Sequence, residues 1–115
     1  MEIISQKIVL SSLKTKYMEY FTTMIKADVD VDQRIMAIDA ELHSDLEALL
    51  LDQGSKQEHI WGINLYPDKT KTDCIEYTSL INIRPAQENR SMEVEDQHIR
   101  ETIRSIVEEL IDFES

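Results

Sequence analysis

The spacing of apolar residues predicts a helix followed by a β-hairpin in the first third of the chain. An apolar face at helical spacing begins around residues 10–12 and consists of Leu13, Tyr17, Tyr20, Phe21 and Met24. From Ile25 the period changes to two, because the apolar residues Ile25, Ala27, Val29 and Val31 alternate with Lys26, Asp28 and Asp30. That alternation predicts a half-buried strand. A turn at Asp32-Gln33 would then lead into a partner strand over Ile35 to Glu41.

A second helix is predicted near Asp45 to Gln53. Ser44 and Glu47 have the spacing of a capping box, in which each side chain binds a backbone N–H of the first turn. Gly54 stands where a helix often ends in a left-handed residue. The apolar face of this helix would consist of Leu46, Leu49 and Leu50.

Two more strands and a last helix are predicted beyond Gly54. The strands cover His59 to Tyr66 and Cys74 to Arg84, joined by the polar segment 67–73. Asp96 is a suitable N-cap for the last helix. The apolar stripe of that helix consists of Ile99, Ile103, Ile106, Val107, Leu110 and Ile111.

This order of elements predicts an α+β fold. We expect a two-layer sandwich, with a mainly antiparallel four-stranded sheet made of two hairpins and about three helices on one face. The chain has 115 residues, of which 42% are hydrophobic, so residues 1–115 are expected to form a single domain around one core. One face of the sheet would then remain uncovered.

The net charge of the protein limits the kinds of molecule that it is expected to bind. The formal net charge is −11, from 23 acidic and 12 basic residues, which disfavours nucleic acid and anionic membranes as partners. No apolar run approaches the roughly 20 residues that cross a bilayer, and the N-terminus lacks the pattern of a secretion signal, so a cytoplasmic location is expected. The single cysteine, Cys74, has no cysteine partner for a disulfide or a zinc site, and no cofactor is expected.

Polar residues on the second hairpin are the first candidate site. Strand alternation would place Asn64, Asn82 and Arg84 on one face, where carboxamide and guanidinium groups can hold a carboxylate, a phosphate or a peptide. Asn89 and Arg90 follow in a loop that would suit an anion. A solvated sheet face and a subunit interface are the other interpretations of this surface. For the loop, a surface segment whose arginines form exposed ion pairs is the preferred interpretation.

The segment 41–45 is the second candidate. Glu41 and His43 have the chemistry of an acid–base pair, and with Asp45 they could also ligate a divalent metal. The competing interpretation is that Asp45 complements the dipole of the helix that begins here. We therefore assign no metal site and keep Glu41 and His43 as candidate catalytic residues.

A calcium-like spacing of aspartates occurs between Asp28 and Asp39. Gln33 stands where the sharp turn of a calcium-binding loop requires glycine, and Asp39 replaces the bidentate glutamate. The alternation that begins at Ile25 instead favours a strand edge carrying acidic residues.

Three stretches together resemble a small prokaryotic family known only as a domain of unknown function. They are residues 41–45, residues 54–58 with 61–67, and Ser79 through Ser91. The similarity spans nearly the whole chain. It implies a short cytoplasmic protein without an assigned activity, and it implies glycines near the first hairpin turn and near Asp39-Ala40, where this chain has none.

No sequence motif indicates an activity, so the sequence alone leaves the function unknown. With only Gly54 and Gly62, the chain cannot form a phosphate-binding glycine loop or a dinucleotide fingerprint. The preferred hypothesis is a non-catalytic binding or assembly module that forms a homodimer. The alternative is an enzyme or binder that acts on a small anionic or phosphorylated ligand, with or without a divalent metal. In that alternative Arg84 and Arg90 position the anion, Asn82 and Asn89 orient it, and Glu41 or His43 moves protons.

Overall fold

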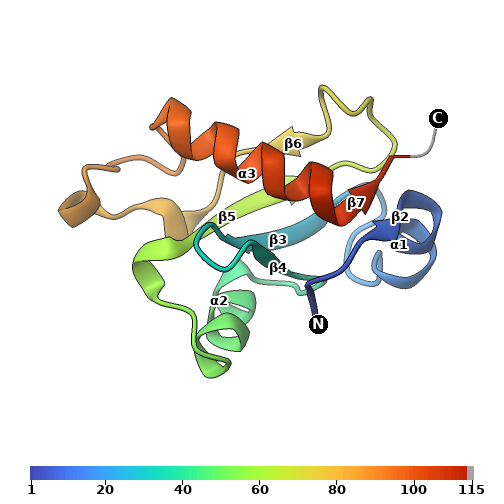
Figure 1. Cartoon of the computed structure of the whole chain (residues 1–115), viewed down its shortest axis with the longest axis horizontal. Coiled ribbons are helices and arrows are strands. Elements are labelled where there is room, and N and C mark those ends of the chain that lie inside the picture. Colours follow the sequence, from blue (N-terminus) through green and yellow to red (C-terminus); the bar gives the residue numbers. More distant parts are fainter. Residues whose placement is uncertain (114–115) are drawn as a thin grey trace.

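The computed structural model describes residues 1–113. These residues form an antiparallel sheet of five strands, and Figure 1 shows its arrangement with the helices. The strand order is β1-β4-β3-β5-β6, and every neighbouring pair is antiparallel. The strands are β1 (Glu2–Ile4), β3 (Ile25–Asp30), β4 (Ile35–Ile38), β5 (Ile60–Leu65) and β6 (Ile75–Glu76). A separate parallel pair, β2 (Ile8–Val9) with β7 (Ile111–Asp112), joins the two ends of the described chain.

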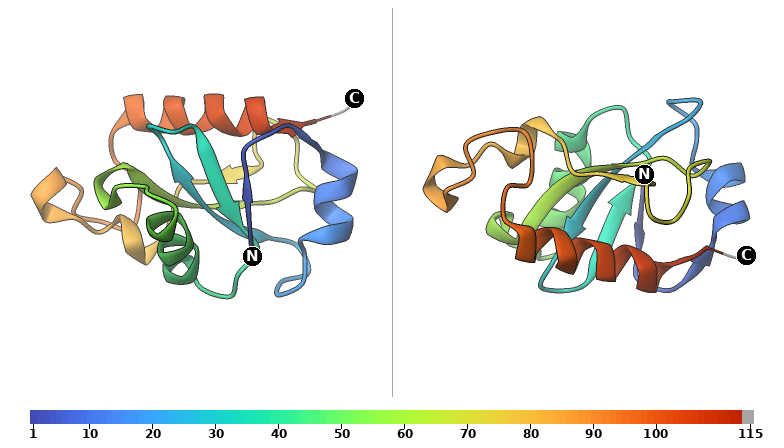
Figure 2. Two further views of the ribbon diagram at one scale, coloured as in Figure 1. Left: turned by 60° about the horizontal axis from the view of Figure 1, so that its bottom comes forward. Right: turned by 90° about the horizontal axis from the view of Figure 1, so that it is seen from above.

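Helices cover both faces of the sheet (Figure 2). The described part of the chain forms three α-helices, α1 (Leu10–Lys16), α2 (His43–Asp52) and α3 (Gln97–Leu110). The helix α3 lies across one face and α2 lies against the other, while α1 sits at the end of the sheet beside β2. The α+β prediction is therefore confirmed, but the prediction of four strands with all helices on one face is wrong.

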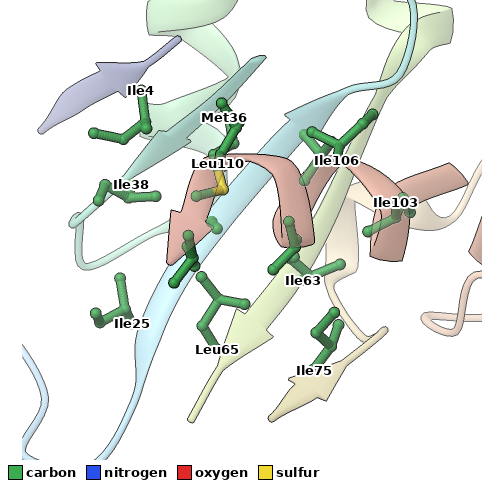
Figure 3. Close-up of a cluster of buried hydrophobic side chains, with 14 of the residues drawn as sticks. Ile4, Ile25, Met36, Ile38, Ile63, Leu65, Ile75, Ile103, Ile106 and Leu110 are labelled. Atoms are coloured by element: carbon green, nitrogen blue, oxygen red, sulfur yellow. The ribbon is translucent and has the colours of Figure 1, made fainter. Parts of the chain in front are cut away.

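The core has two parts because the sheet is covered twice. The larger part lies between α3 and the sheet, where Ile103, Ile106 and Leu110 face the labelled strand residues (Figure 3). The smaller part packs Leu46 and Leu50 of α2 against Ala37 and Ile60 on the opposite face. All six residues of β5 are buried. Burial on both faces is the reason that the expected uncovered face does not exist.

The turn between β3 and β4 is held by an aspartate rather than by a glycine. Asp30 Oδ1 accepts the N–H groups of Asp32 at 2.9 Å and Gln33 at 3.0 Å, and its Oδ2 accepts the hydroxyl of Ser55 at 2.6 Å. Arg34 takes the left-handed conformation, with φ of 57°. Asp30 is thus buried in the central strand of the sheet, so the prediction of a strand edge carrying acidic residues is wrong.

The ends of the helices agree only in part with the sequence signals. Asp96 caps α3 as predicted, accepting the N–H groups of His98 and Ile99, and Gly54 has φ of 107° after α2. The predicted capping box does not form, because α2 begins at His43 and its N-cap residue is Leu42. The first helix ends at Lys16, since the segment that follows contains aromatic and β-branched residues that are weak helix formers.

The predicted strand over Cys74 to Arg84 is short. Only Ile75–Glu76 pair with β5, and the chain then forms the 3-10 helices η2 (Leu80–Asn82) and η3 (Pro85–Gln87). Local bonds explain the change, because Ser79 Oγ accepts the N–H of Ile81 and so starts η2. The segment 79–83 folds over the sheet face that α2 leaves free, which creates the cavity described next.

Candidate functional site

A cavity of about 360 Å³ opens where the start of α2 meets strands β3 and β5 and the segment 78–81. Lys26 and Asn64 are paired residues of β3 and β5, so they enter the cavity side by side. Leu42, His43 and Ser44 form the wall at the N-terminus of α2. The remaining lining residues are Met24, Thr78, Ser79, Leu80, Ile81 and Met92.

The charge of the cavity is opposite to that of the protein. Within the described residues no aspartate or glutamate lines it, although the chain has 23 acidic residues. Lys26 is the one formally charged lining residue, and it forms no ion pair with any of residues 1–113. Its ammonium lies 5.2 Å from the centre of the Phe21 ring. An anion inside the cavity would therefore meet the Lys26 ammonium, and none of the described residues places a carboxylate in the cavity lining.

His43 enters the cavity with a fixed tautomer. Its Nε2 lies 2.8 Å from the carbonyl oxygen of Ile63, and since a carbonyl only accepts, Nε2 carries the proton. Burial lowers the pKa of His43 below its ordinary value, and the nearby Lys26 ammonium lowers it further, against the raising effect of the Ile63 carbonyl and the Asn64 side chain. In the resulting neutral ring, Nδ1 is the hydrogen-bond acceptor.

Asn64 lines the cavity and has an unused acceptor. Its Nδ2 donates to Glu76 Oε1 at 2.7 Å and to the carbonyl oxygen of Thr78 at 3.2 Å. These two acceptors determine the orientation of the carboxamide, because a flipped amide would bring oxygen against oxygen. The Oδ1 atom is buried and has no hydrogen-bond partner among the described residues.

The first turn of α2 adds backbone donors. Its N-cap residue, Leu42, has an apolar side chain that cannot accept a hydrogen bond from the N–H groups of that turn. The positive end of the helix dipole also faces this wall of the cavity, and both effects favour an anion. Lys26 and the N-terminus of α2 thus give the same electrostatic preference from two different elements.

The rim of the cavity is apolar and exposed. Leu42, Leu80 and Met92 have exposed fractions of 52%, 70% and 40%. Large exposed aliphatic side chains gathered at one opening are a feature of binding sites for molecules that carry an apolar group.

A family model described as "Protein of unknown function (DUF5674)" matches residues 2–110. The chain belongs to this family. No curated protein and no solved structure matches the chain. Membership in the DUF5674 family agrees with the resemblance seen in the sequence, and it names no activity.

In this DUF5674 protein the cavity brings together two of the seven predicted site residues, His43 and Asn64. Glu41 is exposed and does not line the cavity. Arg90 is exposed as well, and its backbone N–H donates to Glu95. The roles assigned to these residues stay predictions.

Asn82 and Asn89 use their carboxamides inside the fold. Asn82 bonds to both the N–H and the carbonyl of Gly62. Asn89 Nδ2 donates to the carbonyl oxygens of Asn82, Ser91 and Glu93, and its Oδ1 accepts the N–H of Glu95. Their hydrogen-bonding groups are therefore occupied by backbone that lies beside the cavity.

Arg84 belongs to a buried charge cluster under α2. Its guanidinium contacts Glu47 Oε2 at 3.5 Å, donates to the carbonyl oxygen of Ile60, and lies 4.9 Å from the Trp61 ring. Asp28 is completely buried in the same region, and neither of its carboxylate oxygens has a partner among the described residues. Burial raises the pKa of Asp28 well above its ordinary value, Glu47 raises it further, and Arg84 opposes the shift.

Sequence reasoning missed the cavity residues that come from outside the expected polar face. The alternation places Lys26 correctly on a strand, but its position beside Asn64 depends on the register between β3 and β5. Leu80 and Met92 reach the cavity only because residues 77–84 leave the sheet.

Within residues 1–113 no group of three or more His, Cys, Asp or Glu side chains is arranged to hold a metal ion. None of the helices in that range has both the length and the apolar character needed to span a bilayer.

Proposed function

We propose that this protein is a binding domain for a small anionic organic molecule, received in the cavity at the N-terminus of α2. The observation that carries the proposal is a cavity lining without any carboxylate from residues 1–113, in a chain of net charge −11, together with the unpaired Lys26. The anion would lie between the Lys26 ammonium and the first turn of α2. Hydrogen bonds to charged groups contribute about 1.5–3 kcal/mol each.

The apolar rim defines the other half of the ligand. Leu42, Leu80 and Met92 would cover a hydrocarbon group once the anion is bound. A volume of about 360 Å³ is near the lower end for ligand sites in proteins, so the ligand is a small organic acid rather than a nucleotide.

The test compares two molecules of the same shape and opposite charge. Isocaproate and isohexylamine are titrated separately while amide NMR signals are followed. Isocaproate is expected to shift the signals of residues 43–45, 64 and 78–81, and isohexylamine is not. An amine that binds as tightly as the acid would overturn the proposal.

The matched variants are Lys26→Met and Lys56→Met, which remove the same charge. Lys56 is exposed and lies outside the cavity lining. Lys26→Met is expected to weaken isocaproate binding about tenfold, which corresponds to about 1.4 kcal/mol. Lys56→Met is expected to leave it unchanged, and equal losses in both variants would show that only the overall charge matters.

The homodimer hypothesis is weaker than the sequence suggested. Its motivation was an uncovered sheet face, and α2 with the segment 79–83 covers that face. The exposed Leu80 and Met92 are the remaining argument for self-association. Light scattering over a range of concentrations would test it, and a strictly monomeric protein would end it. The prokaryotic origin and the cytoplasmic location also stay predictions.

A further inference from the structure

The cavity carries a second polar feature, which an anion alone does not satisfy. Asn64 Oδ1 is an acceptor with no partner among residues 1–113, on a side chain that is only 8% exposed. The neutral His43 ring adds a second acceptor, Nδ1, to the same lining. A buried acceptor that is unpaired already costs free energy in the unliganded protein, so a ligand that supplies a donor here would gain affinity over one that lacks a donor.

From these two acceptors we infer that the ligand is an organic acid with a hydrogen-bond donor next to its carboxylate, an amino acid or a hydroxy acid with an apolar side chain. This inference rests on the proposed function, since it concerns the same cavity. The carboxylate would bind Lys26 and the first turn of α2. The neighbouring ammonium or hydroxyl would donate to Asn64 Oδ1 and His43 Nδ1.

The strand register explains why donor and carboxylate must be close together in the ligand. Lys26 and Asn64 are directly paired across β3 and β5. Side chains of such pairs start about 5 Å apart. The Lys26 ammonium and Asn64 Oδ1 would therefore contact neighbouring groups of a bound molecule. A donor at the far end of a ligand would lie among the apolar rim residues instead.

Glu76 makes the Asn64 oxygen a better acceptor. The Glu76 carboxylate accepts a hydrogen bond from Asn64 Nδ2 at 2.7 Å, and bonds linked in this way polarise one another. Tyr66 donates its hydroxyl to the same oxygen of Glu76 at 3.2 Å. Neither Glu76 nor Tyr66 lines the cavity, so both act on Asn64 from outside the cavity.

The experiment uses three acids with the same hydrocarbon group and the full-length protein. Leucine, its hydroxy analogue and isocaproate are titrated by amide NMR. At least one of the two donor-bearing acids is expected to bind about tenfold more tightly than isocaproate, because an unpaired buried acceptor costs roughly 1–3 kcal/mol. The order of leucine and its hydroxy analogue then shows whether the donor is an ammonium or a hydroxyl.

Two variants locate the preference. Asn64→Ala is expected to reduce the tenfold preference to about one, whereas Gln57→Ala, which removes an exposed carboxamide outside the cavity, is expected to keep it. The unmodified protein decides the question even if Asn64→Ala does not fold. If isocaproate binds as tightly as both other acids, the donor requirement is wrong while anion binding stands. If none of the three acids binds at millimolar concentration, the proposed function fails as well.

Discussion

Asn82 pairs with Gly62 in the way that a neighbouring strand would. The Oδ1 atom of Asn82 accepts the N–H of Gly62 at 2.8 Å, and its Nδ2 donates to the carbonyl oxygen of Gly62 at 2.9 Å. The short strand β6 pairs only with Asn64 and Leu65, so it leaves Gly62 without a backbone partner on that side. The buried Asn82 side chain thus satisfies the backbone N–H and carbonyl of Gly62 at the edge of β5. It also holds the segment 79–83 over the cavity.

Asn82→Asp is expected to destabilise the protein by more than about 2 kcal/mol. A carboxylate cannot donate, so it would face the carbonyl oxygens of Gly62 and Met92 without hydrogen bonds. The measurement is urea unfolding followed by circular dichroism. Asn64→Asp serves as a comparison of the same chemical change at a residue that is 8% exposed. A loss below about 0.5 kcal/mol for Asn82→Asp would contradict the role assigned to its carboxamide.

Gly62→Ala tests the close approach of the segment 79–83 to the sheet. A β-carbon at this position would lie 2.5 Å from the Cβ of Ser79 and 2.7 Å from its Oγ. We expect a loss of about 1–3 kcal/mol in the free energy of unfolding, as for other overpacked sites. The double variant Gly62→Ala with Ser79→Gly removes the clash with the Ser79 side chain and leaves only Ile81 Cγ1, at 3.0 Å. Its loss should be smaller than the sum of the two single losses. Additive losses would show that the contact with Ser79 is unimportant.

Asp28→Asn is expected to stabilise the protein increasingly as the pH rises. The pKa of Asp28 is raised in the folded state, so above its ordinary value of 3.8 the folded state binds more protons than the unfolded state. The free energy of unfolding therefore falls as the pH rises from that value through the folded pKa. Asparagine does not titrate and removes this fall. The gain should be small near pH 4 and reach about 1 kcal/mol or more by about pH 8, since a folded pKa one pH unit above the unfolded pKa corresponds to about 1.4 kcal/mol.

The matched control for Asp28 is Asp30, which is equally buried on the same strand. Asp30 accepts three hydrogen bonds, so Asp30→Asn should lower the stability by about 1–3 kcal/mol. Denaturant midpoints at several pH values check both variants. A gain for Asp28→Asn that does not change with pH would show that Asp28 is ionised in the folded protein.

Local signals in the sequence were sufficient for several elements. The strand beginning at Ile25, the cap at Asp96 and the glycine after α2 are confirmed, because each depends on neighbouring residues only. The half-buried character expected of that strand is wrong, since every residue of β3 except Lys26 is buried. His43 and Asn64 could also be identified as site candidates from residue type and position. The prediction that all helices lie on one face of the sheet was wrong for a physical reason. The alternation assigns Asp28 and Asp30 to a solvent-facing side, whereas both are buried beneath α2.

The cavity itself could not be predicted for a related reason. The apolar residues Ile75, Tyr77, Ile81 and Ile83 have the even spacing of one strand face. The side chains of Ser79 and Asn82 nevertheless bond to backbone and turn the chain away from the sheet. Strand periodicity does not register such competition between side chain and backbone. Lys26, Leu80 and Met92 come together only after that turn has formed.

Asp39 gives the last prediction, because it is a non-glycine residue with φ of 73° directly after β4. The resemblance in the sequence implied a glycine in this region, and a left-handed conformation is one that glycine adopts without a steric penalty. Asp39→Gly and Asp39→Ala both remove the carboxylate, but only alanine keeps a β-carbon. The glycine variant is therefore expected to be more stable than the alanine variant by about 0.5–1 kcal/mol, after the greater chain entropy of unfolded glycine is subtracted. Thermal and urea unfolding of the pair measure the difference. An alanine variant as stable as the glycine variant would mean that the backbone relaxes away from the left-handed conformation once the carboxylate is gone.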